Sequence, residues 1–167
     1  WLRDEAVAIY EREAKRRLRE PWAARDEYID VILDRSEERV EQFIAKFALP
    51  GASMTSVLSL LEMQRNAMLM FTSCGWFFAD VSGIETVQVL HYAARVIQLA
   101  GQVSEAELEA QFLERLEPAH SNLRDRGTAR QLYEREVLPL RLDLSSVAAH
   151  YAVLSLFDNF DDEARVY

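Results

Sequence analysis

Glycine and proline are scarce in this chain, and their scarcity limits the folds available to it. Only 5 glycines and 4 prolines occur in 167 residues. Short strands joined by tight turns need many such residues, so a β-sandwich or β-barrel is disfavoured. Alanine, leucine, glutamate and arginine, all strong helix formers, are abundant. The composition therefore predicts an all-α fold, and the length suffices for a sizeable core.

Cysteine is almost absent, because Cys74 is the only one. A lone cysteine cannot form an internal disulfide, and it fits a reducing, cytoplasmic compartment. His91, His120 and His150 lie on different segments without metal-ligand spacing, so we expect no metal and no cofactor. Cys74 is expected to act as a small hydrophobe, since only His91 or His150, distant in sequence, is available as a base.

A long apolar run and an excess of positive charge are also missing. No segment approaches the roughly 18 consecutive apolar residues of a membrane span, and no signal peptide is visible. The formal net charge is −9, whereas a nucleic-acid binder normally carries a basic face. The one basic run, 15–19, is flanked by glutamates and is typical of a solvated helix face. We therefore expect neither nucleic acid nor membrane as a partner.

Hydrophobic periodicity divides the chain into about seven or eight helices that form a single-domain bundle over residues 1–167. Segment 53–71 is apolar nearly all round, which predicts a buried central helix, with segment 84–100 as the second member of a buried pair. Prolines mark several ends, because proline cannot continue a helix. The expected helices span residues 4–20, 22–33, 36–49, 53–71, 84–100, 104–116 and 128–138, and a last one begins at 143.

Capping residues predict how some of these helices begin and end. Ser36 is expected to cap the third helix, because the two glutamates after it favour a first turn. Gly101 is expected to end the fifth helix as its C-cap. Ser104 and Glu107 have the spacing of a capping box for the next one.

The two ends of the chain suggest that it belongs to something longer. The chain starts at Trp1 rather than at a methionine. The acidic tail, 158–167, is expected to turn towards a strand at 164–167 and to lead towards a following domain. We therefore expect an excised domain.

Segment 71–86 concentrates unusual residues. It holds the only cysteine, a Trp-Phe-Phe triplet, two glycines and two carboxylates. Glycines and crowded aromatics suit a shaped break between two helices better than a helix interior. A site is therefore expected here more than anywhere else.

Individual residues of this segment have competing interpretations. Ser82 and Glu85 have capping-box spacing, which gives Glu85 a structural role as the alternative to a substrate contact. Asp80 either caps the same helix or accepts hydrogen bonds from hydroxyl groups in a groove. Trp76 either fills the core or offers a flat face on which the C–H face of a sugar stacks.

A polar stripe crosses the otherwise apolar segment 84–100. Its members recur at helical spacing, so they share one face and are expected to meet solvent, a groove or a polar network. They are Glu85, Gln88, His91, Arg95 and Gln98.

Several motifs together resemble a known family. The residues concerned are Leu61-Glu62-Met63-Gln64-Arg65, Thr72-Ser73-Cys74-Gly75-Trp76-Phe77-Phe78, Ser82-Gly83-Ile84-Glu85-Thr86-Val87-Gln88, Tyr92-Ala93-Ala94-Arg95, Ser121-Asn122, Leu132-Tyr133-Glu134 and Val147-Ala148-Ala149-His150-Tyr151-Ala152. They resemble a helical domain of unknown function (number 3536) that follows a glycoside hydrolase family 57 catalytic domain in bacterial proteins. The likeness covers about 22–157. It departs from the family pattern at Ala79, where an acid is expected, and at Phe71, where tyrosine is common.

The resemblance implies a retaining glycoside hydrolase or glucanotransferase acting on α-glucans. Its two catalytic carboxylates, about 5–5.5 Å apart, would lie on an upstream barrel of the same polypeptide, so this chain alone is expected to be catalytically silent. The helical domain would wall the substrate cleft and contact an α-glucan or malto-oligosaccharide. The residues expected to border that cleft are Trp76, Asp80, Glu85, Gln64 and His150.

Two other functions stay open. One is a structural bundle that docks a partner domain or forms a homodimer and has no ligand site, marked by a broad apolar surface. The other is a self-contained enzyme that uses Asp80 and Glu85 as an acid–base pair.

Overall fold

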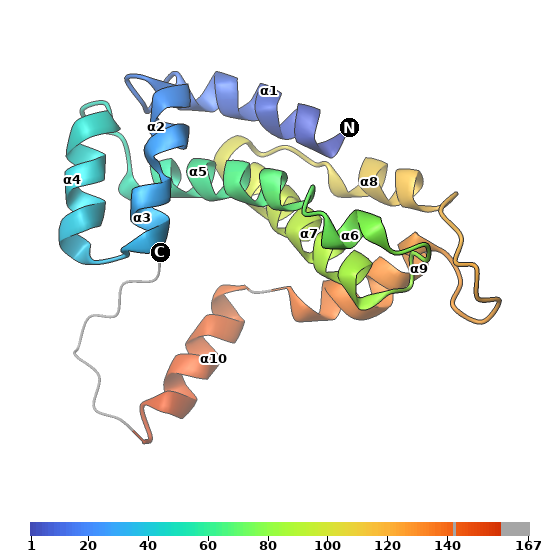
Figure 1. Cartoon of the computed structure of the whole chain (residues 1–167). Coiled ribbons are helices and arrows are strands. Elements are labelled where there is room, and N and C mark those ends of the chain that lie inside the picture. The colour runs from blue at the N-terminus through green and yellow to red at the C-terminus, as the bar shows by residue number, and fades with distance from the viewer. Residues whose placement is uncertain (142, 158–167) are drawn as a thin grey trace.

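The computed structural model describes residues 1–141 and 143–157, apart from the side chain of Leu144. Within these ranges every regular element is helical, which confirms the all-α prediction (Figure 1). No helix there is long and apolar enough to cross a bilayer. The α-helices are α1 Leu2–Ala14, α2 Pro21–Glu27, α3 Ile29–Leu33, α4 Glu37–Phe47, α5 Met54–Leu69, α6 Cys74–Phe77, α7 Ile84–Ser104, α8 Glu109–Leu116, α9 Ala129–Leu132 and α10 Leu144–Leu154.

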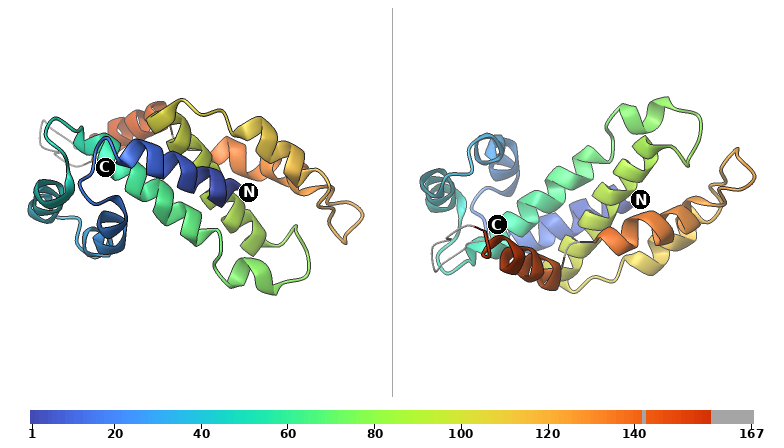
Figure 2. Two further views of the ribbon diagram at one scale, coloured as in Figure 1. Left: turned by 90° about the horizontal axis from the view of Figure 1, so that it is seen from above. Right: turned by 90° about the horizontal axis from the view of Figure 1, so that it is seen from below.

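Helices α5 and α7 form the buried central pair that the sequence predicts. They lie side by side, and α1 runs along α5, as both views of Figure 2 show. Leu60 and Met63 of α5 and Val96 of α7 are completely buried. Because α5 is apolar on nearly every side, it can be covered on several faces at once.

The first helix is shorter than predicted. It ends at Ala14, because the chain from Arg17 to Arg19 leaves the helix and pairs with the end of α4. The Arg19 N–H donates to the Phe47 carbonyl at 2.9 Å, and the Leu49 N–H donates to the Arg17 carbonyl at 2.8 Å. The basic run 15–19 is therefore part of the connection after α1, which is hydrogen-bonded to the end of α4, and it does not form a solvated helix face. The predicted helix 22–33 is likewise two helices, α2 and α3.

Gly101 does not end α7, and this prediction was wrong. The helix continues to Ser104, and Glu105 takes the left-handed conformation at φ 58° instead. The Ser104 hydroxyl donates to the Ala100 carbonyl at 2.7 Å, so Ser104 does not cap α8 and the expected capping box is absent. A serine can bond back to the preceding turn of its own helix, and that use competes with capping.

The last third of the chain is less regular. After α9 the backbone makes a π-helical turn, Tyr133–Val137, and a 3-10 turn, Leu138–Leu140. Helix α10 begins as predicted, because the Asp143 carboxylate accepts from the Ser146 N–H at 2.6 Å. It stands apart from the bundle (Figure 1). The strand expected at 164–167 lies outside the described residues.

Candidate functional site

The glycine- and aromatic-rich segment forms the predicted break between the two central helices. Within it, α6 is a single turn that packs on α7. Gly75 permits this contact, because a Cβ at this position would lie 2.2 Å from Cγ2 of Val89. The close approach of two backbones is a frequent reason for glycine. The backbone of α6 is therefore held against α7, while the side chains of Trp76, Phe77 and Phe78 are exposed.

A largely apolar groove opens beside α6, and we call it the aromatic groove. It lies among α1, α6, α7 and α8 and has a volume of about 480 Å³. A volume of this size is ordinary for a small-molecule site. Its aromatic lining consists of Trp1, Phe71, Trp76, Phe78 and Phe112.

Trp76 is a surface residue of this groove and does not fill the core. Its side chain is 68% exposed. The indole stacks nearly parallel on Phe71, with ring centroids 6.1 Å apart and an interplanar angle of 10°. Its Nε1–H donates to the Met70 carbonyl at 3.1 Å, which fixes the orientation of the ring. The result is a held, solvent-facing aromatic plane.

Apolar exposure continues outside the groove. Phe77 is 82% exposed and packs edge-on against Phe78 at a centroid distance of 5.3 Å. Ile84, at the start of α7, is also highly exposed. Neither Phe77 nor Ile84 lines the aromatic groove. The segment therefore exposes further apolar side chains outside the aromatic groove.

The carboxylate of Asp80 is occupied by hydrogen bonds from other groups of the protein. Its carboxylate accepts from the hydroxyl of Ser82 at 2.5 Å and from the Ser82 N–H at 2.8 Å. It also accepts from the Ser121 hydroxyl at 3.1 Å and from the Asn122 N–H at 2.7 Å. The hydroxyl and the N–H of Ser82 hold the pKa of Asp80 at about 2, below its ordinary 3.8, and Asn122 and Ser121 contribute to the shift. We call these contacts the Asp80 clasp. The hydroxyl groups it binds are the chain's own.

Glu85 is not part of a capping box, contrary to prediction. Gly83, not Ser82, occupies the N-cap position of α7, and no side chain caps that end. The Ser82 hydroxyl donates to the Asp80 carboxylate, a charged and therefore strong acceptor two residues earlier. Glu85 does not line the aromatic groove.

Two other predicted site residues lie elsewhere. Gln64 is 2% exposed, and its Nε2 donates to the Ala6 carbonyl at 3.1 Å, which ties α5 to α1 in the core. His150 is exposed on α10, apart from the bundle. The structure therefore brings Trp76 and Asp80 to one groove and leaves Glu85, Gln64 and His150 outside it.

Cys74 is exposed, so it is not the small buried hydrophobe that was predicted. No group of three or more histidine, cysteine, aspartate or glutamate side chains within 1–141 and 143–157 is arranged to hold a metal ion.

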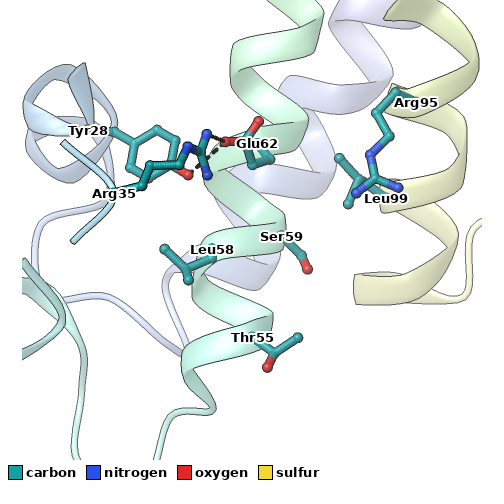
Figure 3. A pocket seen from close by; sticks show the side chains of 8 residues that line it. All are labelled: Tyr28, Arg35, Thr55, Leu58, Ser59, Glu62, Arg95 and Leu99. Atoms are coloured by element: carbon teal, nitrogen blue, oxygen red, sulfur yellow. Dashed lines mark hydrogen bonds and ion pairs between the residues drawn. The ribbon is translucent and has the colours of Figure 1, made fainter. Parts of the chain in front are cut away.

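A second groove, which we call the polar groove, runs between α5 and α7. It consists of two hollows of about 310 and 320 Å³ that share Glu62 and Arg95. Figure 3 shows the first hollow, where Tyr28 and Arg35 reach Glu62 from one side while Arg95 and Leu99 stand on α7 opposite.

Glu62 is the centre of a hydrogen-bonded cluster. Its carboxylate accepts from the Tyr28 hydroxyl at 2.8 Å, from Nη2 of Arg35 at 2.5 Å and from Nη1 of Arg65 at 3.1 Å. Burial alone would raise the pKa of Glu62, but the three donors outweigh it and lower the pKa below its ordinary value. Glu62 is therefore an ion-paired carboxylate. Burial also raises the pKa of Tyr28, which keeps its hydroxyl a donor.

Most of the polar stripe of α7 lies on this groove, one of the three surroundings that its spacing left open. Gln88, His91, Arg95 and Gln98 all line the second hollow, whereas Glu85 does not. The residues that sequence reasoning missed are those that meet the stripe from other elements. Arg65 comes from α5, and Arg141 follows the 3-10 turn. Glu62 and Arg65 belong to the 61–65 motif that carries the family resemblance, but only the fold places them opposite Arg95.

Comparison with known proteins gives one result. A protein-family model described as Domain of unknown function (DUF3536) matches residues 1–167. No curated protein and no solved structure matches the chain. The match covers the aromatic groove, the polar groove and the Asp80 clasp together.

Proposed function

We propose, from the premise that this chain belongs to the DUF3536 family, that it is the helical accessory domain of a glycoside hydrolase family 57-like enzyme acting on α-glucans. In this proposal the aromatic groove forms one wall of the substrate cleft. The association with a family 57 catalytic barrel rests on the resemblance of the sequence motifs.

The observation that carries the proposal is the exposed, fixed plane of Trp76 in a concave site. The ring has one face on Phe71, and its Nε1–H is already bonded to Met70. Such a plane offers an apolar face to the C–H side of a glucose ring without further ordering of the side chain. An α-glucan fits this chemistry better than a charged metabolite does, since the groove is largely apolar.

Catalysis is assigned to an upstream barrel domain of the same polypeptide. A retaining mechanism needs a free carboxylate nucleophile and a second carboxyl group as general acid. Asp80 is unsuited to either role, because its oxygens accept four hydrogen bonds from Ser82, Ser121 and Asn122. This disfavours the self-contained enzyme that pairs Asp80 with Glu85. We place the full-length protein, a bacterial hydrolase or glucanotransferase, in the cytoplasm. A reducing compartment keeps a solvent-exposed thiol such as that of Cys74 from forming disulfides.

Titration with maltoheptaose tests whether the groove binds sugar. We expect the tryptophan fluorescence of the native chain to change saturably at millimolar sugar, because one stacked ring in an open groove gives weak binding. The change is expected to disappear in Trp76→Ala. Trp22→Ala is the matched control, since Trp22 lies on α2, away from the groove, and its removal should leave the titration intact.

A flat titration for the native chain would contradict independent glycan binding. It would leave the second candidate function, a docking bundle, as the better explanation. The exposed side chains of Phe77 and Ile84 outside the groove favour that second function, because exposed apolar surface can mark a protein interface. The partner would be the upstream barrel or a second copy of the chain.

A further inference from the structure

Arginine side chains gather around the second hollow of the polar groove. Arg65 of α5, Arg95 of α7 and Arg141 all line it, and His91 adds another nitrogen. Among the described residues that line this hollow, Glu62 is the one carboxylate. The chain as a whole has a formal net charge of −9. Arg65 is ion-paired with Glu62 and Arg141 with Glu109, so the positive charge of the hollow that lacks an ion pair among the described residues is that of Arg95.

Glu62 does not neutralise this charge. It already accepts from Arg35, Tyr28 and Arg65, so one carboxylate is shared by two guanidinium groups before Arg95 is considered. Arg95 forms no ion pair within the described part of the chain. Its side-chain hydrogen bond goes to the neutral Oε1 of Gln98 at 2.7 Å. Arg95 is thus a charged donor without a charged acceptor.

Arg141 leaves a second donor unmatched. Its Nη2 contacts Glu109 and the Tyr133 hydroxyl, which fixes the guanidinium at the edge of the hollow. Its Nε is buried and has no hydrogen-bond partner in the structure. Buried polar atoms in native proteins are nearly always bonded to protein, water or ligand. Arg141 is therefore held at the edge of the hollow by Glu109 and Tyr133, with one N–H donor left unmatched.

We propose that the second hollow of the polar groove binds a small oxyanion such as a phosphate group, with Arg95 donating to its oxygens and Arg141 at the edge of the hollow. Guanidinium groups suit this ligand, because their planar N–H donors match the geometry of phosphate oxygens. Arg65, which is ion-paired with Glu62, lies across the hollow on α5. The neighbouring hollow, lined by Thr55 and Ser59, leaves room for a small body attached to the anion.

The size and charge of the site favour a small molecule over a polymer. The hollow has a volume of about 320 Å³, and an anionic polymer would meet the negative charge of the rest of the chain. The inference does not rest on the proposed α-glucan function. The two sites are separate, so failure of the maltoheptaose titration has no bearing on this one.

Calorimetric titration with inorganic phosphate tests the proposal at constant ionic strength, held with sodium chloride. We expect saturable binding to the native chain and at least a roughly tenfold loss of affinity in Arg95→Gln, because a charge-assisted hydrogen bond is removed. Arg95→Lys keeps the charge but loses the planar fork and should bind with intermediate affinity. Arg124→Gln is the matched control, because Arg124 is an exposed arginine of the same charge in the loop after α8 and lies outside the groove.

Circular dichroism of each variant establishes that it is folded before its titration is interpreted. Equal loss of affinity in Arg95→Gln and Arg124→Gln would overturn the proposal, since it would indicate general charge attraction. Absence of saturable phosphate binding to the native chain would overturn it outright. If Arg95→Gln does not fold, Arg95→Lys decides the matter, and unchanged affinity in that variant contradicts a site built on the guanidinium.

Discussion

At the scale of single residues, Asp80 shows how a side chain suited to ligand binding is committed to the fold. Four protein groups donate to its carboxylate, from the residues just after it and from a loop about forty positions later. Asn122 reinforces the same junction, because its Nδ2 donates to the Ala79 carbonyl at 2.8 Å. The clasp thereby joins the break after α6 to the loop that follows α8.

Asp80→Asn is expected to loosen this junction, because an amide retains one acceptor oxygen and loses the charge that strengthens each bond. Amide hydrogen exchange at Ser82 and Asn122 should speed up, while exchange in α5 should not change. Asp30→Asn is the control, an exposed acidic residue in α3. Unchanged exchange at Asn122 would show that the clasp does not hold the loop.

The same residue predicts a dependence on pH. The folded state lowers the pKa of Asp80 to about 2 from 3.8, so the clasp stabilises the protein above about pH 4 and this contribution is lost as the pH falls towards 2. The difference in melting temperature between the native chain and Asp80→Asn should therefore shrink between pH 4 and pH 2. A constant difference over that interval would contradict the assignment.

At the scale of elements, Gly75 and Gly101 differ in whether the fold requires glycine: a side chain is excluded at Gly75 and has room at Gly101. Gly75 lies where α6 touches α7, and a Cβ there would meet Val89 at 2.2 Å. Gly101 lies inside α7, and its nearest neighbour to an added Cβ is the Ala106 carbonyl oxygen at an ordinary 3.5 Å.

Gly75→Ala should therefore destabilise the domain by about 1–3 kcal/mol through overpacking, because the β-branched Val89 side chain has little freedom to move aside. Gly101→Ala should stabilise it by about 0.5–1 kcal/mol, because alanine restricts the unfolded chain and favours the helix. Urea unfolding followed by circular dichroism measures both changes. Equal effects of the two substitutions would show that α6 does not pack on α7 as described.

At the scale of the whole molecule, the bundle and α10 are separable. The core is built from α1, α5 and α7, and α10 stands apart from it with Tyr151, Val153 and Leu154 exposed (Figure 1). Among the described residues α10 has no extensive packing against the other helices, and a helix placed in this way contributes little to the stability of the rest, because helical stability comes mainly from the packing of an apolar face.

A chain that ends at Arg141 should therefore keep the cooperative unfolding of the bundle, with a melting temperature within about 2 °C of that of the full chain. Ending there preserves the contact of Arg141 with Glu109. Thermal denaturation followed by circular dichroism measures it. A fall of more than about 5 °C would mean that α10 packs on the bundle in solution.

Local sequence patterns predicted the helices well but predicted the contacts between them poorly. The central pair was predictable, because the apolar residues of α5 and α7 recur around the helix. The Ser82 and Ser104 capping boxes were wrong, because α7 and α8 begin at other residues, with Gly83 and Leu108 at their N-cap positions. The two serine hydroxyls donate to Asp80 and to the Ala100 carbonyl.

The candidate site was also predictable only in part, because it depends on contacts between elements. The aromatic cluster identified segment 71–86, and the exposure of Trp76 is consistent with a binding surface there. Gln64 resembled a polar site residue, but its partner is a backbone carbonyl 58 residues earlier. The arginines of the polar groove come from separate elements, and only the packing of α5 on α7 brings them together.

The Asp80 clasp also has a kinetic consequence. Its two halves are separated in sequence by α7 and α8, and bringing the ends of so long a segment together is entropically costly while that segment is unstructured. Once α7 and α8 have folded and the chain has returned along α8, the two loops are neighbours and the closure costs little. The clasp should then be absent from the folding transition state and present in the native state. Such contacts slow unfolding while leaving the folding rate unchanged. The clasp should thus lengthen the lifetime of the folded domain without accelerating its folding.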